Sequence, residues 1–362
     1  MRVVHCINDV RIGGIERLVL DLVKVQLANG LDVTILVDRL EGLFVDQLNS
    51  IGVQIFVSGI RNGFDINREG LRVYRRVFNE CDIIHLHTFS LLRFHVAIRS
   101  KAKVVYTVHG ISKGIRDLNG KNLLREYLKK WCTNNVDMVV GNSKFTLEVL
   151  KKQYNLNKVS TLVIDNGINI DNASSGLRSR LNNYDELIVG VVSRLVQRKR
   201  LDRLIDGFDL FLESGGKGKL FIVGDGPLRD TLVEQVRLKN LEDDIIFMGF
   251  QTNMNKVYDS FDVCVFPSEK EPFGLVALEA YLKGLPVIAF SDSGGLKEII
   301  ELLDWQNIVC DEEDLANRLL LMSHLSSSEL FSLERIELVK AQYSMKKMYE
   351  SYLDVYKSII NI

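Results

Sequence analysis

The chain has 362 residues, 46% of them hydrophobic and 26% charged, and a formal net charge of −1. It is therefore long enough for two globular domains, and its overall charge gives it no general attraction for polyanions such as nucleic acid. Five scattered cysteines without C-x-x-C spacing argue against a disulfide framework or zinc site and favour a reducing, cytoplasmic compartment. We expect no membrane span and no signal peptide, because the N-terminal apolar run turns polar after seven residues.

The first half alternates short β-forming runs with amphipathic helices. We expect a helix over residues 16–29 and strands at 3–7, 33–37, 53–57, 83–87, 104–108 and, as the last of this half, 138–140. Short apolar strands that alternate with helices predict a parallel sheet covered on both faces.

Several polar or glycine positions in this half follow the ends of predicted strands. Gly13 and Gly14 turn the chain from the first strand into a helix that carries Glu16, and His109 ends the strand over 104–108. His85 and His87 point to the same face of one strand, as residues i and i+2 do. Their spacing is compatible with metal ligation, but no third ligand is near in sequence, so we predict no metal site and expect His87 to line a binding site.

Residues 90–158 hold 14 basic and 4 acidic side chains, the strongest charge imbalance in the chain. Within them, residues 123–131 place apolar side chains at helical spacing with cations opposite. This pattern is typical of a helix at a membrane surface, while an ordinary core helix is the slightly favoured alternative. Nucleic acid is not expected as a partner, because the segment has no recognised nucleic-acid-binding fold and no interleaved aromatic residues.

The second half repeats the alternation, with strands expected at 187–192, 220–223, 245–248, 263–266 and 287–290. Two such series predict two doubly wound α/β domains, over residues 1–167 and 168–344. Residues 345–362 have apolar side chains at helical spacing and form a C-terminal helix.

Three segments of the second half carry the chemistry. Arg194 and Lys199 follow a strand and precede a helix, which is an arrangement that binds anions. Gly224 ends the next strand and lets the backbone approach a ligand closely. Glu271 lies before a helix that we expect over 275–283, with Pro272 where the helix begins, and Glu279 follows two turns later.

Together with Gly13-Gly14-x-Glu16, these segments closely resemble the motifs of the retaining glycosyltransferases of family 4. Ser193 and Arg200 depart from the family's Gly-Arg-Leu-x-x-x-Lys-Gly signature, in which both positions are glycine. The resemblance spans nearly the whole chain and is strongest over 187–295. It implies the GT-B fold, in which two Rossmann-like doubly wound domains face a central cleft, and a C-terminal helix that crosses back onto the N-terminal domain.

The resemblance also implies roles for individual residues. Arg194 and Lys199 would grip the donor diphosphate, Glu271 would orient the transferred sugar and Glu279 would bind the ribose. The remaining donor contacts would come from the backbone of Gly224, Gly249, Phe250, Phe273, Gly274 and Leu275. On the acceptor side, Gly13, Gly14, Glu16 and His87 would lie in the cleft, and His109 would contact the reacting sugar.

The implied activity is retaining transfer of a hexose, with UDP-hexose favoured, from a nucleoside-diphosphate sugar to a hydroxyl of a glycan or lipid-linked acceptor in cell-surface polysaccharide synthesis. The sequence contains no Asp-x-Asp, so we expect a metal-independent enzyme without cofactor. Residues 90–158 would contact the inner membrane surface peripherally. Two alternatives stay open: a nucleotide-sugar epimerase or hydrolase of the same fold, and a catalytically silent sugar-nucleotide-binding subunit.

Overall fold

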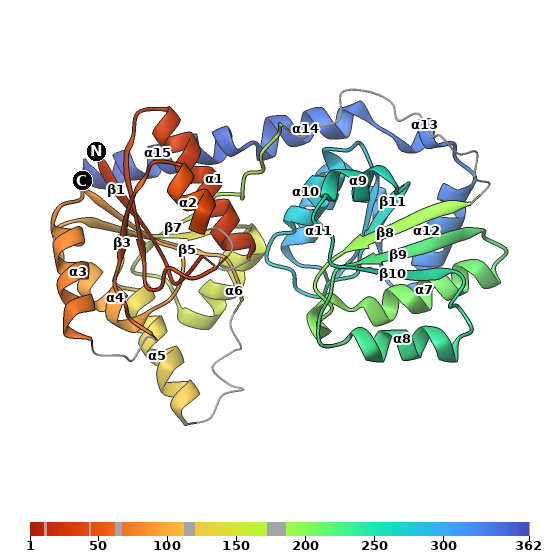
Figure 1. Cartoon of the computed structure of the whole chain (residues 1–362), viewed down its shortest axis with the longest axis horizontal. Helices are drawn as coiled ribbons and strands as arrows, with labels where there is room; N and C mark the ends of the chain where they lie inside the picture. Colours follow the sequence, from red (N-terminus) through yellow and green to blue (C-terminus); the bar gives the residue numbers. More distant parts are fainter. Residues whose placement is uncertain (11–12, 43–44, 62–66, 112–119, 172–185, 362) are drawn as a thin grey trace. The chain divides into compact units, whose positions relative to one another are not determined.

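The computed structural model describes residues 1–10, 13–42, 45–61, 67–111, 120–171 and 186–361 (Figure 1). The chain forms two compact units. Unit 1 comprises Met1–Gly167 together with Met345–Ile362, and unit 2 comprises Ile168–Ser344.

Unit 1 is built on a seven-stranded parallel sheet with the order β3-β2-β1-β4-β5-β6-β7. Its strands are β1 (Arg2–Ile7), β2 (Asp32–Val37), β3 (Gln54–Val57), β4 (Ile83–Leu86), β5 (Lys103–Val108), β6 (Met138–Gly141) and β7 (Ser160–Val163). The expectation that the strand over 138–140 is the last of this half is wrong. β7 follows it as an edge strand paired with β6.

Helices lie on both faces of this sheet (Figure 1). They are α1 (Gly14–Ala28), α2 (Val45–Ser50), α3 (Arg68–Asn79), α4 (Leu91–Ala97), α5 (Lys121–Thr133), α6 (Lys144–Tyr154) and α15 (Met345–Ile360). One apolar core lies under α3 and α4 and contains Phe78 and Phe94. On the other face, α15 packs against α1 and buries Tyr352, Tyr356 and Ile359 with Leu22. The C-terminal helix is therefore part of the core of unit 1.

Unit 2 contains a six-stranded parallel sheet with the order β10-β9-β8-β11-β12-β13. Its strands are β8 (Leu187–Val192), β9 (Gly218–Val223), β10 (Ile245–Gly249), β11 (Val263–Phe266), β12 (Val287–Phe290) and β13 (Ile308–Val309). The two-residue strand β13 was not predicted from the sequence. The chain enters this unit beside its exit, where the Ile168 amide donates to the Tyr343 carbonyl at 2.7 Å.

The helices of unit 2 pack around this sheet, and α7 contacts both α8 and α12. They are η2 (Gln197–Lys199), α7 (Leu201–Glu213), α8 (Arg229–Leu238), α9 (Met254–Asp259), α10 (Leu275–Tyr281), α11 (Gly295–Leu303), η3 (Trp305–Asn307), α12 (Glu312–Ser323), α13 (Ser327–Leu330) and α14 (Leu333–Tyr343). Helix α10 begins at the predicted residue and ends at Tyr281, two residues earlier than predicted. It begins three residues after Pro272, because Gly274 takes a left-handed backbone with φ 111°.

Each sheet has one position where the strand order reverses. In unit 1 the chain runs outward from β1 through β2 to β3, then returns to place β4 on the other side of β1. In unit 2 the same reversal separates β8 from β11. Loops after the two strands at such a reversal diverge and leave a crevice where α/β proteins bind ligands. Within the described residues, no helix is long and apolar enough to cross a membrane.

Candidate functional site

The reversal in unit 2 brings together a carboxylate and two cations from loops far apart in sequence. Glu271 follows β11, whereas Arg198 and Lys199 lie in η2 after β8. The Lys199 ammonium is 2.8 Å from Glu271 Oε2, and the Arg198 guanidinium donates to the same oxygen at 2.6 Å. The backbone of Glu271 is fixed too: its amide donates to the Ser293 carbonyl, and its carbonyl accepts from the Gly295 amide.

These two cations decide the charge of Glu271. Burial alone would raise its pKa, but the charges of Lys199 and Arg198 and their hydrogen bonds outweigh that effect, so the pKa lies below its ordinary value. Glu271 is therefore an ionised acceptor at neutral pH. Lys199 is the better shielded partner, since 15% of its side chain is exposed against 48% of that of Arg198.

A buried arginine holds the neighbouring loops in place. Arg203, on α7, donates to the Pro267 carbonyl at 2.8 Å and forms a bidentate ion pair with Asp292. Its guanidinium also lies 3.8 Å from the centre of the Phe290 ring. Arg203 thereby links the loop after β11, which carries Glu271, to the loop after β12.

The loop after β8 is shaped by close backbone contacts. A Cβ on Gly224 would overlap the Ser193 carbonyl oxygen, and the Gly224 amide donates to the Gly249 carbonyl at 2.9 Å. Arg200 has the left-handed backbone angles φ 48° and ψ 41°, which explains why a glycine would suit that position. Arg194 is exposed, and among the described residues we find no hydrogen bond or ion pair to its side chain.

The other predicted donor residues lie on or near α10 and β10. The Glu279 carboxylate accepts a hydrogen bond from the Tyr258 hydroxyl at 2.9 Å. Phe273 is buried with its ring against Tyr343, just before Gly274 and Leu275 at the start of α10. Phe250 is 66% exposed and directly follows Gly249 at the end of β10.

The reversal in unit 1 carries the predicted glycine loop. Gly13 is extended, and α1 begins at Gly14. A Cβ on Gly13 would overlap the Glu16 carboxylate, so the Glu16 side chain folds back over this glycine. Buried Arg93 ties together the loops after β1 and β4, because its guanidinium donates to the Ile7 carbonyl at 3.0 Å and the Thr88 carbonyl at 2.7 Å.

Four histidines form a cluster: His5 on β1, His85 on β4, and His87 and His109 directly after β4 and β5, with the first three buried and His109 half-buried. His5 Nδ1 lies 2.8 Å from His87 Nε2, and His87 Nδ1 lies 3.1 Å from His109 Nε2. The His85 ring is 4.0 Å from the His87 ring, centre to centre. Burial lowers the pKa of His5 and of His109 to about 4, and burial together with neighbouring histidines lowers those of His85 and His87 well below the ordinary value. All four rings are neutral at pH 7.

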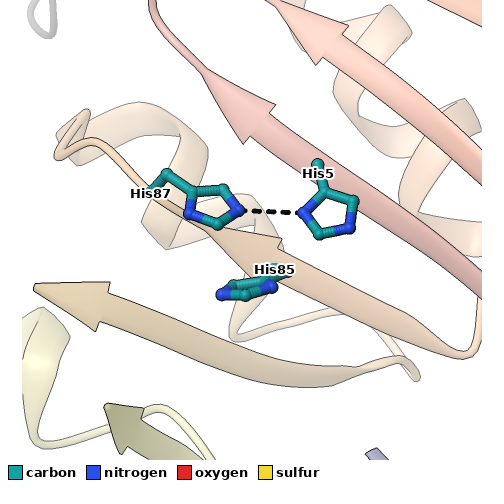
Figure 2. A group of neighbouring side chains, drawn as sticks. All are labelled: His5, His85 and His87. Carbon is teal, nitrogen blue, oxygen red and sulfur yellow. Dashed lines mark hydrogen bonds between the residues drawn. The ribbon is translucent and has the colours of Figure 1, made fainter. Parts of the chain in front are cut away.

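His5, His85 and His87 also have the spacing of a metal site (Figure 2), with one potential ligand nitrogen from each within 4.8 Å of the others. His5 was not predicted as the third member from the sequence, although the parallel register of β1 and β4 pairs it with His85. Each ring nitrogen of these three histidines already has a hydrogen-bond partner.

Several residues that shape the two sites were not predicted from the sequence, namely Arg198, Arg203, Tyr258, His5 and Gln26. Arg198 adjoins Lys199 and was available as a second cation. The other four depend on partners from distant strands or helices, which no local pattern reveals. The predicted donor residues all belong to unit 2, and the predicted glycine loop and histidines to unit 1.

Comparison with protein families gives two adjacent matches. Residues 12–172 match the model "Glycosyltransferase Family 4", and residues 175–330 match the model "Glycosyl transferases group 1". The two models together span most of both units.

Curated relatives carry related names. The chain is 28% identical, over 64% of its length and 46% of the relative's, to a poly(ribitol-phosphate) alpha-N-acetylglucosaminyltransferase of Staphylococcus aureus. It is 29% identical, over 76% of its length and 67% of the relative's, to an alpha-monoglucosyldiacylglycerol synthase of Streptococcus pneumoniae. The aligned part thus spans less than half of the first relative.

Solved structures share the fold. Anabaena HepE, in complex with UDP and glucose, matches with a TM-score of 0.79 and 20% identity over 99% of this chain and 100% of that one. A structure titled TarM matches with a TM-score of 0.77 and 16% identity, over 98% of both chains. At these identities the likeness establishes the fold.

Proposed function

This chain belongs to the family 4 glycosyltransferases of the GT-B fold, and we propose that it is a retaining hexosyltransferase using a nucleoside-diphosphate sugar, with UDP-hexose favoured. The acceptor would be a hydroxyl of a glycan or lipid-linked substrate in cell-surface polysaccharide synthesis. The observation that carries the proposal is the ionised Glu271 held by Lys199 and Arg198 where the strand order of unit 2 reverses.

The donor's charge pattern matches this arrangement. The diphosphate is an anion, and Lys199 with the exposed Arg194 would neutralise the charge that grows on it as it departs. Glu271 would accept hydrogen bonds from hydroxyls of the sugar, and Glu279 from the ribose. We propose that these fixed cations replace a bridging metal ion.

Retention of configuration would follow from attack on the face that the diphosphate leaves. The bond between the anomeric carbon and the phosphate oxygen breaks, and the acceptor oxygen bonds to the same carbon. The acceptor proton passes to the departing phosphate oxygen. His109 would contact the reacting sugar without serving as the base, in agreement with its lowered pKa.

Unit 1 would bind the acceptor through the Gly13–Glu16 loop and His87. On α5, within the basic segment 90–158, Leu124, Tyr127 and Trp131 are 60%, 53% and 46% exposed. Exposed apolar side chains on a basic helix suit the anionic inner surface of a membrane. We therefore propose a cytoplasmic protein that contacts this surface peripherally. Residues 112–119 of the segment lie outside the described residues.

The proposal is tested by product analysis with a panel of nucleoside-diphosphate hexoses, each with and without a glycan or lipid acceptor. A transferase forms glycosylated acceptor, a hydrolase releases sugar without acceptor, an epimerase changes the donor, and a silent subunit changes nothing. Glu271→Ala and Lys199→Ala should each lower kcat at least about a hundredfold, because each removes a charged contact to the transition state.

Matched controls come from an exposed ion pair on α8, between Arg237 and Glu234. Arg237→Ala and Glu234→Ala should keep wild-type turnover. Wild-type turnover in a folded Glu271→Ala or Lys199→Ala variant would refute the site assignment.

A further inference from the structure

A chain of hydrogen bonds runs through the core of unit 1 from the side-chain amide of Gln26 to His109. Gln26, on α1, places Oε1 2.8 Å from His5 Nε2. His5 Nδ1 is 2.8 Å from His87 Nε2, and His87 Nδ1 is 3.1 Å from His109 Nε2. Gln26, His5 and His87 are fully or almost fully buried. We call Gln26, His5 and His87 the relay.

The relay has a direction, which its first member sets. The Gln26 Oε1 atom can only accept, so His5 Nε2 carries the proton. In a neutral imidazole the other nitrogen is then an acceptor, so His87 Nε2 donates to His5 Nδ1. The same rule makes His87 Nδ1 an acceptor for the Nε2–H of His109. Each ring thus carries its proton on Nε2.

With the protons placed in this way, one ring nitrogen of His109 has no hydrogen-bond partner in the relay. Its Nδ1 atom is buried and has no hydrogen-bond partner among the described residues. Because Nε2 carries the proton, Nδ1 presents a lone pair. A buried acceptor without a hydrogen bond destabilises the site, so a ligand that donates a hydrogen bond to this atom would be favoured.

The side-chain amide of Gln26 meets the relay through its oxygen. Its Oε1 atom lies 2.8 Å from His5 Nε2, whereas its Nε2 atom is buried and has no hydrogen-bond partner among the described residues.

A second hydrogen-bond network in the same core runs through His85 and shares no hydrogen bond with the relay. His85 Nδ1 bonds to the Tyr356 hydroxyl at 2.6 Å, and His85 Nε2 bonds to the Thr107 hydroxyl at 2.7 Å. The Thr107 hydroxyl also bonds to that of Tyr352 at 2.9 Å. This second network offers a control in the same core.

A metal ion is the competing explanation for His5, His85 and His87 (Figure 2). Two nitrogens that each lie about 2.0–2.1 Å from one tetrahedral zinc are roughly 3.3 Å apart. His5 Nδ1 and His87 Nε2 are 2.8 Å apart, which is the length of a hydrogen bond. Both nitrogens of His85 are also engaged by hydroxyls, so the hydrogen-bonded relay is the arrangement that the geometry favours.

We infer that Gln26, His5 and His87 are positioning residues, which fix the tautomer of His109 so that its Nδ1 atom accepts a hydrogen bond from a substrate hydroxyl. The identity of the ligand as a sugar or sugar acceptor rests on the proposed function; the tautomer does not. A buried acceptor of this kind would select a substrate with a hydroxyl at that position over its deoxy analogue.

The tautomer is measured directly by nitrogen-15 NMR of the histidine rings in the full chain, where a protonated and an unprotonated ring nitrogen have distinct shifts. The six histidines are assigned by single substitutions, with the exposed His95 and His324 as references. In the wild type we expect His109 to show protonated Nε2 and unprotonated Nδ1. The opposite pattern, or equal mixing of the two tautomers, overturns the inference.

Two variants separate a directing role from a structural one. Gln26→Met keeps the volume of the side chain but removes the acceptor, and it should shift both ring nitrogens of His109 toward a mixture. Thr107→Val breaks only the network around His85 and should leave the His109 pattern unchanged. An unchanged His109 in Gln26→Met refutes the relay, and if that variant does not fold, the wild-type spectrum still decides.

Titration with Zn²⁺ and with EDTA tests the metal. EDTA should leave the shifts of His5, His85 and His87 unchanged. Metal-dependent shifts of all three would overturn the relay in favour of a metal site. If the chain is a glycosyltransferase, Gln26→Met should also lower kcat about tenfold, because losing one hydrogen bond to the reacting substrate slows the reaction by about that factor. The NMR result stands whether or not transferase activity is found.

Discussion

Lys199 and Arg198 contact the same oxygen of Glu271 but should differ in importance. Arg198 is half exposed, so water and salt screen its charge, whereas Lys199 is well shielded. We expect Arg198→Ala to lower kcat less than about tenfold, against at least about a hundredfold for Lys199→Ala. Equal losses in the two variants, measured by steady-state kinetics, would contradict the ranking.

Gly224 combines a left-handed backbone with a close backbone contact. Its φ is 126°, and a Cβ would overlap the Ser193 carbonyl oxygen. We expect Gly224→Ala to lower the free energy of unfolding by about 3 kcal/mol or more, because the backbone must move. Gly249→Ala is the control: its φ is also positive, at 65°, but a Cβ there meets nothing within 4 Å. Its cost, measured by urea unfolding, should be about 1 kcal/mol.

The lowered pKa of His5 predicts how stability depends on pH. Below about pH 6.5 the unfolded chain takes up a proton on this ring, whereas the folded chain excludes it until about pH 4. The contribution of neutral His5 therefore decreases as the pH falls, by about 2 kcal/mol between pH 7 and pH 5.

Urea unfolding at the two pH values measures this loss. It should shrink in His5→Gln, which has no titrating ring, and persist in His95→Gln, which alters an exposed histidine. An unchanged pH dependence in His5→Gln would show that the lowered pKa of His5 does not cause the loss of stability.

Among the elements, the central strands were predictable and the edges were not. Strands such as β8 and β11 are continuous apolar runs because both faces are buried. β7 alternates exposed and half-buried residues at the edge of its sheet, and β13 has two residues. Such short or half-exposed runs look like loops in a sequence.

The sequence predicted which loops form the candidate site, but not which side chains in those loops contact one another. The family resemblance assigned Lys199 and Glu271 to one donor site, and parallel strands place their following loops at one edge of the sheet, where the two side chains meet. The pairing of side chains within that edge was not predictable: Arg198 rather than Arg194 joins Lys199 on Glu271. Rotamers and partners depend on packing that local sequence does not encode.

Helix α5 gives a prediction for membrane contact. Replacing Leu124, Tyr127 and Trp131 together by Ser should weaken binding to vesicles of anionic phospholipid at least about tenfold, because it removes the exposed apolar side chains. Leu321→Ser with Leu325→Ser, which changes exposed leucines of unit 2, is the control. Vesicle co-sedimentation that is equal for all variants would exclude α5 as the contact.

For the molecule as a whole, the two units repeat one architecture with different chemistry. Each has a parallel sheet with one reversal of strand order, but unit 2 places cations and a carboxylate there, whereas unit 1 places a glycine loop and neutral histidines there. The doubly wound fold class was predicted from the sequence and is confirmed, because the alternation of strands and helices recurs in both halves.

We propose that cations of unit 2 hold a nucleoside diphosphate without a metal ion. Calorimetric titration of the full chain with UDP, GDP and ADP, first in EDTA and then in Mg²⁺, separates this mode of binding from a metal-dependent one. We predict equal affinity in both buffers for the preferred nucleotide, and a loss of about tenfold or more in Lys199→Ala but not in Arg237→Ala. Binding that disappears in EDTA, or that Lys199→Ala leaves unchanged, would show that these cations do not hold the diphosphate without a metal ion.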